Sequence, residues 1–286
     1  MKAAFQKDDA FLADIAKARR RGVTRLWWLG QSGFLLQAGG KSILFDPYLS
    51  DSLTRKYANT DKPHVRLTER VVPPESLQGI DCITCSHNHT DHLDKETLLP
   101  LLEHNPGAKL LIPRANVTFV LERLGGVEAR LVSVDAGECV SVAGIQFHGI
   151  PSAHNTVERD TEGHCLYLGY VADLASIKLY HSGDTLLHGE LAPALGRFAL
   201  DVVCLPINGN RPERRVAGNL TGSEAAQLAR QVGAQLAVPH HFDMFAFNTE
   251  LPDEFAAECR RIGQPYRILQ NGEGFDLPVT KSKRGI

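Results

Sequence analysis

Hydrophobic and polar positions along the chain follow two periods, the two-residue period of strands and the 3.6-residue period of helices. Short apolar runs bounded by Gly, Pro and polar turns predict strands, and longer amphipathic stretches predict helices. The predicted strands are 24–29, 33–38, 41–45, 80–86, 109–112, 130–134, 138–142, 145–150, 165–171, 177–181, 201–206, 235–239, 266–269 and 274–277. The predicted helices are 8–21, 94–104, 114–123, 222–232 and 252–262.

This order of elements predicts one layered domain. Many strands with helices outside them favour an α/β fold in which two sheets pack face to face between helices. The sequence contains no short repeat, linker or low-complexity stretch, so we expect a single domain over residues 1–286, with 1–22 as an N-terminal helical extension. Residues 48–72 are polar and irregular, which predicts a long surface loop that overhangs a site.

Composition narrows the class of protein. Hydrophobic residues make up 43% of the 286 positions, which is enough for a full core and excludes a disordered chain. The net charge of −2 argues against a protein built to bind nucleic acid. No apolar run is long enough to span a membrane, and residues 1–20 lack the apolar core of a signal peptide. We therefore expect a cytoplasmic protein.

The six cysteines are expected to be reduced and buried, as is usual in the cytoplasm. Cys82 and Cys85 have the spacing of a redox pair or a zinc knuckle. They lie in a predicted strand, however, and residues three apart on a strand face opposite sides of the sheet. We therefore expect two core thiols that do not meet.

The strongest chemical pattern is the segment 86–92, which has the sequence Ser-His-Asn-His-Thr-Asp-His between a predicted strand and a predicted helix. His87 and His89 are two positions apart in an extended segment, so they point the same way and can share one metal ion. Asp91 and His92 follow where the chain turns, so they can hold a second ion. Asp91 also lies near a helix N-terminus, where negative charge is favoured.

This pattern resembles the HxHxDH signature of the metallo-β-lactamase-fold hydrolases. The resemblance extends over about residues 24–278 and implies a four-layer αββα sandwich whose later metal ligands follow strands far along the chain. Asp46, after the apolar run 43–45, matches the early aspartate that supports the ligand loops from behind. The ligands that the resemblance implies are His87, His89 and His154 for one ion, Asp91, His92 and His241 for a second, and Asp184 between them.

Within this fold, the chain resembles the L-ascorbate-phosphate lactonase-like branch in three segments, 27–33, 208–211 and 239–243. The sequence Asp-Pro-Tyr at 46–48 is more similar to the broader group of hydrolases of the fold. The branch implies a lactonase that acts on a small anionic, sugar-derived lactone, with a single manganese ion as one option. Histidine and carboxylate ligands suit zinc, manganese or iron, and the sequence does not choose among them or between one ion and two.

The implied chemistry is hydrolysis by a metal-bound hydroxide, with Asp91 orienting the water or accepting its proton. Two divalent ions and two carboxylates leave a positive charge that favours an anionic substrate. Asn208 and Arg211 follow the predicted strand 201–206 near the expected mouth of the site. Arginine suits phosphate and carboxylate oxygens, so we predict that these two residues bind the substrate. A solvated basic loop is the alternative interpretation.

Two other functions stay open. One is a phosphodiesterase of the same fold acting on a phospholipid or a nucleotide-type substrate, for which the basic amphipathic helix 8–21 offers a weak membrane-facing surface. The other is a non-catalytic metal-binding module, against which the complete ligand set argues. We expect a small anionic molecule as partner, no nucleic acid and no stable membrane insertion, and the sequence leaves homo-oligomer formation open.

Overall fold

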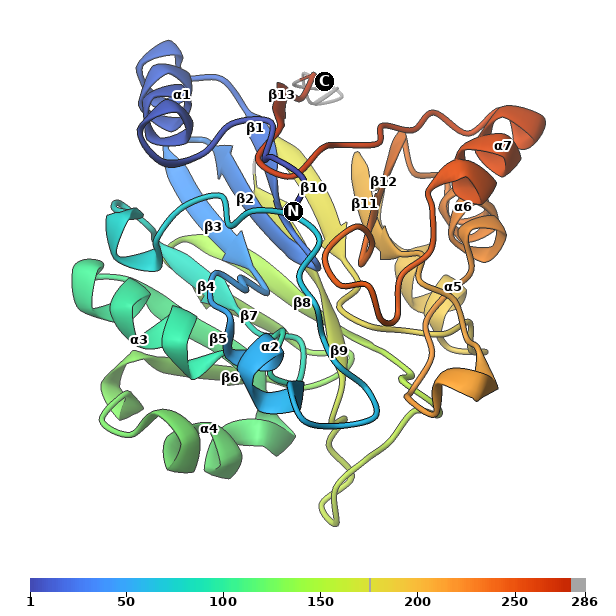
Figure 1. Cartoon of the computed structure of the whole chain (residues 1–286), viewed down its shortest axis with the longest axis horizontal. Coiled ribbons are helices and arrows are strands. Elements are labelled where there is room, and N and C mark those ends of the chain that lie inside the picture. The colour runs from blue at the N-terminus through green and yellow to red at the C-terminus, as the bar shows by residue number, and fades with distance from the viewer. Residues whose placement is uncertain (175, 279–286) are drawn as a thin grey trace, which may run out of the picture.

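The computed structural model describes residues 1–174 and 176–278; residue 175 and the end of the predicted domain, 279–286, lie outside the described residues. The described chain forms two sheets flanked by helices (Figure 1). The first sheet has the order β13 (Gly274–Asp276), β1 (Arg25–Gly30), β2 (Gly33–Ala38), β3 (Lys41–Phe45), β4 (Cys82–Thr84), β5 (Lys109–Pro113) and β6 (Leu131–Val134). The second has the order β12 (Leu236–His240), β11 (Val202–Pro206), β10 (Ile177–His181), β9 (Leu168–Leu174), β8 (Ile145–Pro151) and β7 (Cys139–Val142).

Helices cover the outer face of each sheet, which confirms the predicted α/β sandwich. Figure 1 shows α1, α3 and α4 on one side of the sheets and α5, α6 and α7 on the other. The helices are α1 (Asp8–Arg21), α2 (Ser52–Tyr57), α3 (Lys95–His104), α4 (Val117–Leu124), α5 (Leu191–Leu195), α6 (Gly222–Gln231) and α7 (Asp253–Ile262). None of these helices combines the length and the apolar character that crossing a membrane requires.

Strand β1 shows why the strands of the first sheet are apolar on both faces. Leu26 and Trp28 belong to the core between the two sheets, whereas Trp27 and Leu29 pack with the outer cluster that includes α1 and α3. A strand buried on both faces loses the usual alternation of polar and apolar residues. Each such fully buried side chain contributes about 1.5–3 kcal/mol relative to an exposed one.

The cysteine predictions are confirmed with one exception. Cys82 lies in the core between the sheets and Cys85 lies in the outer cluster, so the two thiols face opposite sides as expected. Five cysteines are buried, but Cys139 is exposed. The expectation of burial is wrong there because β7 is the outermost strand of its sheet and alternate residues face solvent.

Some predicted elements differ from the structure. The segment 48–72 includes the short helix α2, which the sequence pattern does not predict; Leu53 anchors it in a small cluster with Tyr48, Met244 and Phe245. A six-residue helix is unstable alone, so this tertiary packing holds it. The predicted strand 266–269 is wrong: within the described residues, Tyr266 forms an isolated bridge with Ala237 of β12 and no strand develops. Helix α5 is too short for its periodicity to be recognised, and the predicted helix 114–123 begins with a 3₁₀ turn at Arg114–Asn116.

The topology brings five strand ends to one edge of the sandwich. In the first sheet β3 and β4 are parallel, and in the second β8, β10 and β12 run in one direction. A backbone hydrogen bond from Leu168 to Ser86 ties the loop after β4 to the second sheet. Residues that directly follow these strands are therefore neighbours in space although they are far apart in the sequence.

Candidate metal centre

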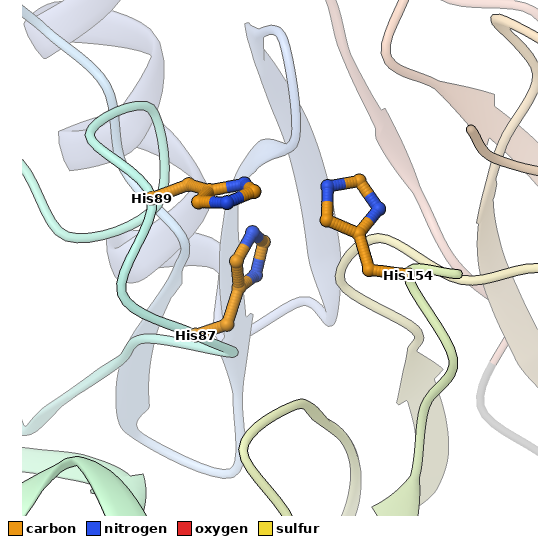
Figure 2. Close-up of side chains that lie close together, drawn as sticks. All are labelled: His87, His89 and His154. Carbon is orange, nitrogen blue, oxygen red and sulfur yellow. The ribbon is translucent and has the colours of Figure 1, made fainter. Parts of the chain in front are cut away.

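Three histidines form the first potential metal-binding group. His87 and His89 come from the loop after β4, and His154 follows β8. Their ligand nitrogens all lie within 4.8 Å of one another, and their ring centroids are 4.6, 4.9 and 5.4 Å apart. Figure 2 shows the three rings turned toward a common point, two from one loop and the third from the opposite side.

A second group lies beside the first. One side-chain atom from each of Asp91, His92 and His241 falls within the same 4.8 Å limit. Asp184, which follows β10, lies between the groups: its carboxylate is 3.3 Å from His92 Nε2, 3.4 Å from His241 Nε2 and 3.7 Å from His154 Nε2. The structure thus brings together all seven residues that the sequence singled out, and a third group, His87, His92 and Asp184, joins the other two. Their role as ligands stays a prediction.

Hydrogen bonds behind the cluster fix the orientation of its rings. Asp46, fully buried after β3, accepts from His92 Nδ1 at 2.5 Å and from the Ser86 N–H at 2.8 Å. His154 Nδ1 donates to the Gly218 carbonyl oxygen at 3.2 Å. In each ring, Nδ1 is engaged and Nε2 faces the cluster, as in histidines held for metal binding. Asp46 therefore lies where the sequence predicted a supporting carboxylate.

The donor atoms fit a divalent cation. His87 Nε2, His92 Nε2 and Asp184 Oδ1 are buried and have no hydrogen-bond partner among the described residues. His92 Nε2 and Asp184 Oδ1 are near enough for an ion pair but are not aligned for a hydrogen bond. Buried polar atoms are almost always paired, so unpaired atoms that converge indicate a missing partner. Imidazole nitrogens and carboxylate oxygens suit zinc, manganese or iron.

The protonation of the first group favours metal binding. Burial lowers the pKa of His87 well below its ordinary value, and the neighbouring histidines lower it further. Burial, with His154 beside it, lowers the pKa of His89 to about 4. Both rings are therefore neutral near pH 7, which is the form that binds a metal ion.

The histidines of the second group carry protons that a metal ion would displace. Burial alone would lower the pKa values of His92 and His241. The negative charges of Asp184 and Asp91 outweigh this effect, so both pKa values lie above the ordinary histidine value. Burial alone would raise the pKa of the Asp184 carboxyl, but His241 and His92 hold that pKa well below its usual range. Without a metal ion, protonated imidazoles thus balance the buried carboxylates.

These shifts predict that metal uptake releases protons. His92 and His241 must lose their protons before they can act as ligands, so about one to two protons should leave for each protein loaded near pH 7. Apparent affinity should fall as the pH drops, beginning above the ordinary histidine pKa of ~6.5 because both pKa values are raised. Calorimetric titration with zinc in buffers of different ionisation enthalpy measures this release. Uptake without proton release between pH 6 and about 8 would contradict the assignment.

The cluster forms one wall of a cavity of about 510 Å³. Lys56, Tyr57 and His64 from the segment 48–72 also line it. The segment therefore borders the site, and its role as an overhang stays a prediction. A cavity of this size holds a small molecule.

Asn208 and Arg211 are not among the residues that line this cavity. Asn208 is fully buried, where its side chain donates to Asn248 and accepts from Asn219. Arg211 is exposed and paired with Glu250 at 2.5 Å. Polar groups of the surrounding loops thus hold both side chains outside the cavity lining, and their role in substrate binding stays a prediction.

Sequence reasoning missed several polar residues of the cavity wall, among them Gln31, Lys56 and Arg123. Gln31 lies in the turn after β1 with φ +48°, and its Nε2 is 2.9 Å from Asp91 Oδ2 and 3.0 Å from His241 Nε2. The Gly-Gln-Ser-Gly turn at 30–33 could have indicated Gln31 as a site residue, but its pattern predicted only a turn and a resemblance to the lactonase-like branch. Lys56 and Arg123 carried no comparable signal.

Comparison with known proteins agrees with this geometry. Residues 25–241 match the family model described as "Beta-lactamase superfamily domain". A UPF0173 metal-dependent hydrolase of Opitutus terrae is 30% identical over 88% of this chain and 100% of its own length. Two solved structures are similar in fold. One is an isothiocyanate hydrolase from Delia radicum gut bacteria (TM-score 0.70, 19% identity, 88% of this chain and 98% of that one). The other is a possible metal-dependent hydrolase from Veillonella parvula (TM-score 0.69, 15% identity, 89% and 100%).

Proposed function

Because the chain belongs to the β-lactamase superfamily and, within it, to the UPF0173 metal-dependent hydrolases, we propose that it hydrolyses the ester bond of a small anionic, sugar-derived lactone. The observation that supports this most is the cluster of three overlapping three-residue groups, one of which includes Asp184, on one wall of a small cavity. We propose that these groups hold one or two ions of zinc or manganese, with iron as a further option. Bound there, a divalent ion would lower the pKa of a coordinated water and polarise the scissile oxygen.

We propose that Asp91 handles the proton of the attacking water. Burial raises the pKa of its carboxyl, but His92 and His241 outweigh that effect and hold it below the usual range, so the group is a carboxylate near pH 7. Its Oδ2 accepts from Gln31, and the side chain also lines the cavity. Asp91 would take a proton as the water oxygen bonds to the acyl carbon, and would return it to the ring oxygen as the ring C–O bond breaks.

Resemblance to the lactonase-like branch also supports this choice, because two of its three segments reach the site. The turn that includes Gln31 contacts Asp91, and the segment 239–243 supplies His241. A phosphodiester is the second candidate substrate, favoured by the basic side chains of Lys56 and Arg123 at the cavity. A non-catalytic role has no such support, since the ligand set is complete.

The test is metal analysis of the purified protein followed by a hydrolysis panel of lactones, phosphodiesters, phosphonate esters and a β-lactam. We expect lactones to be hydrolysed, with chelation of the metal abolishing the activity and re-addition restoring it. Hydrolysis of phosphodiesters alone would select the second candidate. No turnover of any member by protein that carries its metal would overturn the proposal of a lactonase.

A further inference from the structure

Two basic side chains from different helices converge beside the metal cluster. Lys56 Nζ of α2 lies 3.5 Å from Thr90 Oγ1, and Arg123 Nη2 of α4 lies 2.9 Å from the same oxygen. Arg123 Nη1 also donates to the Asn88 carbonyl oxygen at 3.0 Å. All four residues line the cavity, and Thr90 lies between the cluster residues His89 and Asp91 in the chain.

Neither cation has a carboxylate partner. In the part of the chain that the structure describes, no carboxylate oxygen lies within 4.0 Å of the Lys56 ammonium or the Arg123 guanidinium nitrogens. The neighbouring Arg55 differs, since it pairs with Glu96. Two like charges that share one neutral acceptor repel each other, and an anion between them would relieve this repulsion.

The wall next to these cations is aromatic. The rings of Tyr57 and His64 are stacked with centroids 4.5 Å apart, and those of Phe245 and Phe247 lie 5.2 and 5.4 Å from His64. All four residues line the cavity. The cavity therefore has a metal-ligand wall, a basic corner and an apolar surface suited to a flat group.

We propose that Lys56 and Arg123 form an anion-binding site for the carboxylate or phosphate of the molecule that occupies this cavity, with its ring body against the aromatic wall. The planar guanidinium can bind two oxygens of such a group, and the ammonium adds a mobile point charge. The assignment of this anion to the substrate rests on the proposed function. The binding site itself does not, since it needs no turnover.

Calorimetric binding of small probes to the metal-loaded protein tests the site. Phenyl phosphate and benzoate carry the two candidate anions on one ring, and benzyl alcohol is their neutral counterpart. Lys56→Gln and Arg123→Gln should each weaken binding of at least one anion by about 10-fold and leave benzyl alcohol unchanged. The anion with the larger loss identifies the preferred group. Arg55→Gln, with the same change of charge one residue from Lys56 but outside the cavity lining, should bind all three probes like the wild type.

Wild-type affinity of both variants for both anions would overturn the proposal, because the anions would then bind the metal ions alone. Arg123→Gln can alter the loop at Asn88, because Arg123 donates to that carbonyl oxygen. Lys56 is exposed, so Lys56→Gln should leave the fold intact and still tests the anion-binding site. If the two variants lose anion binding but the wild type hydrolyses no lactone, the anion-binding site is supported and the lactonase proposal is rejected. Equal hydrolysis of charged and neutral lactones by wild type and variants, with unchanged probe binding, would reject the anion site alone.

Discussion

Asp184→Ala is expected to lower metal affinity and turnover by more than about 100-fold, beyond the 10–100-fold that loss of a supporting group costs. The carboxylate of Asp184 faces histidines of both groups, at 3.3 Å from His92, 3.4 Å from His241 and 3.7 Å from His154. Its removal takes a donor from the centre of the cluster. Asp91 remains beside His92 and His241 and still raises the pKa of both, so this carboxylate keeps a cationic partner in the variant.

The variant should therefore stay folded while it loses its metal. Elemental analysis gives the metal content, and circular dichroism with thermal unfolding gives the fold. Asp173→Ala is a matched control, because Asp173 pairs with Lys178 at 2.6 Å in the second sheet and does not line the cavity. Full metal occupancy in Asp184→Ala would show that Asp184 is not a ligand.

Asp46→Ala is expected to lower metal affinity by about 10–100-fold through the orientation of the ligands. The substitution leaves His92 Nδ1 and the Ser86 N–H buried without their acceptor. Leaving such groups unpaired costs about 1–3 kcal/mol, so the free energy of unfolding should fall as well. Alanine is also strained at this position, where φ is +39°.

Asp46→Asn separates these effects. Asparagine tolerates the left-handed conformation and retains one side-chain oxygen, so it should preserve more of the stability than alanine does. Competition with a chelator measures metal affinity, and denaturant unfolding of the metal-free protein measures stability. Wild-type metal affinity in both variants would show that Asp46 does not position the ligands.

The segment 86–92 was recognisable as a metal site from its own pattern, whereas His154, Asp184 and His241 were predicted from the resemblance to the metallo-β-lactamase fold. The segment 86–92 joins a strand to a helix, and His154, Asp184 and His241 each follow a strand. Because β3 and β4 are parallel and β8, β10 and β12 run in one direction, such positions meet at one edge. Asp46, which directly follows β3, was also predicted from this resemblance.

The remaining part of the site depends on tertiary contacts that leave no local pattern. Lys56 reaches the cavity because Leu53 anchors α2 against Tyr48 and Phe245, and the sequence gives no periodicity for so short a helix. Arg211 follows the expected strand, yet Glu250 holds its guanidinium away from the cavity. A charged side chain is placed by whichever opposite charge the fold brings near, and that partner lies 39 residues away.

Anomalous diffraction from crystals of the protein, recorded at the absorption edges of zinc, manganese and iron, tests the metal centre most directly. We predict one or two ions in the cavity, one beside His87, His89 and His154 or a pair that also includes Asp91, His92 and His241, at about 2.0–2.2 Å from nitrogen and oxygen donors. Protein prepared with all three metals that binds none of them, or binds them only away from these side chains, would contradict the account.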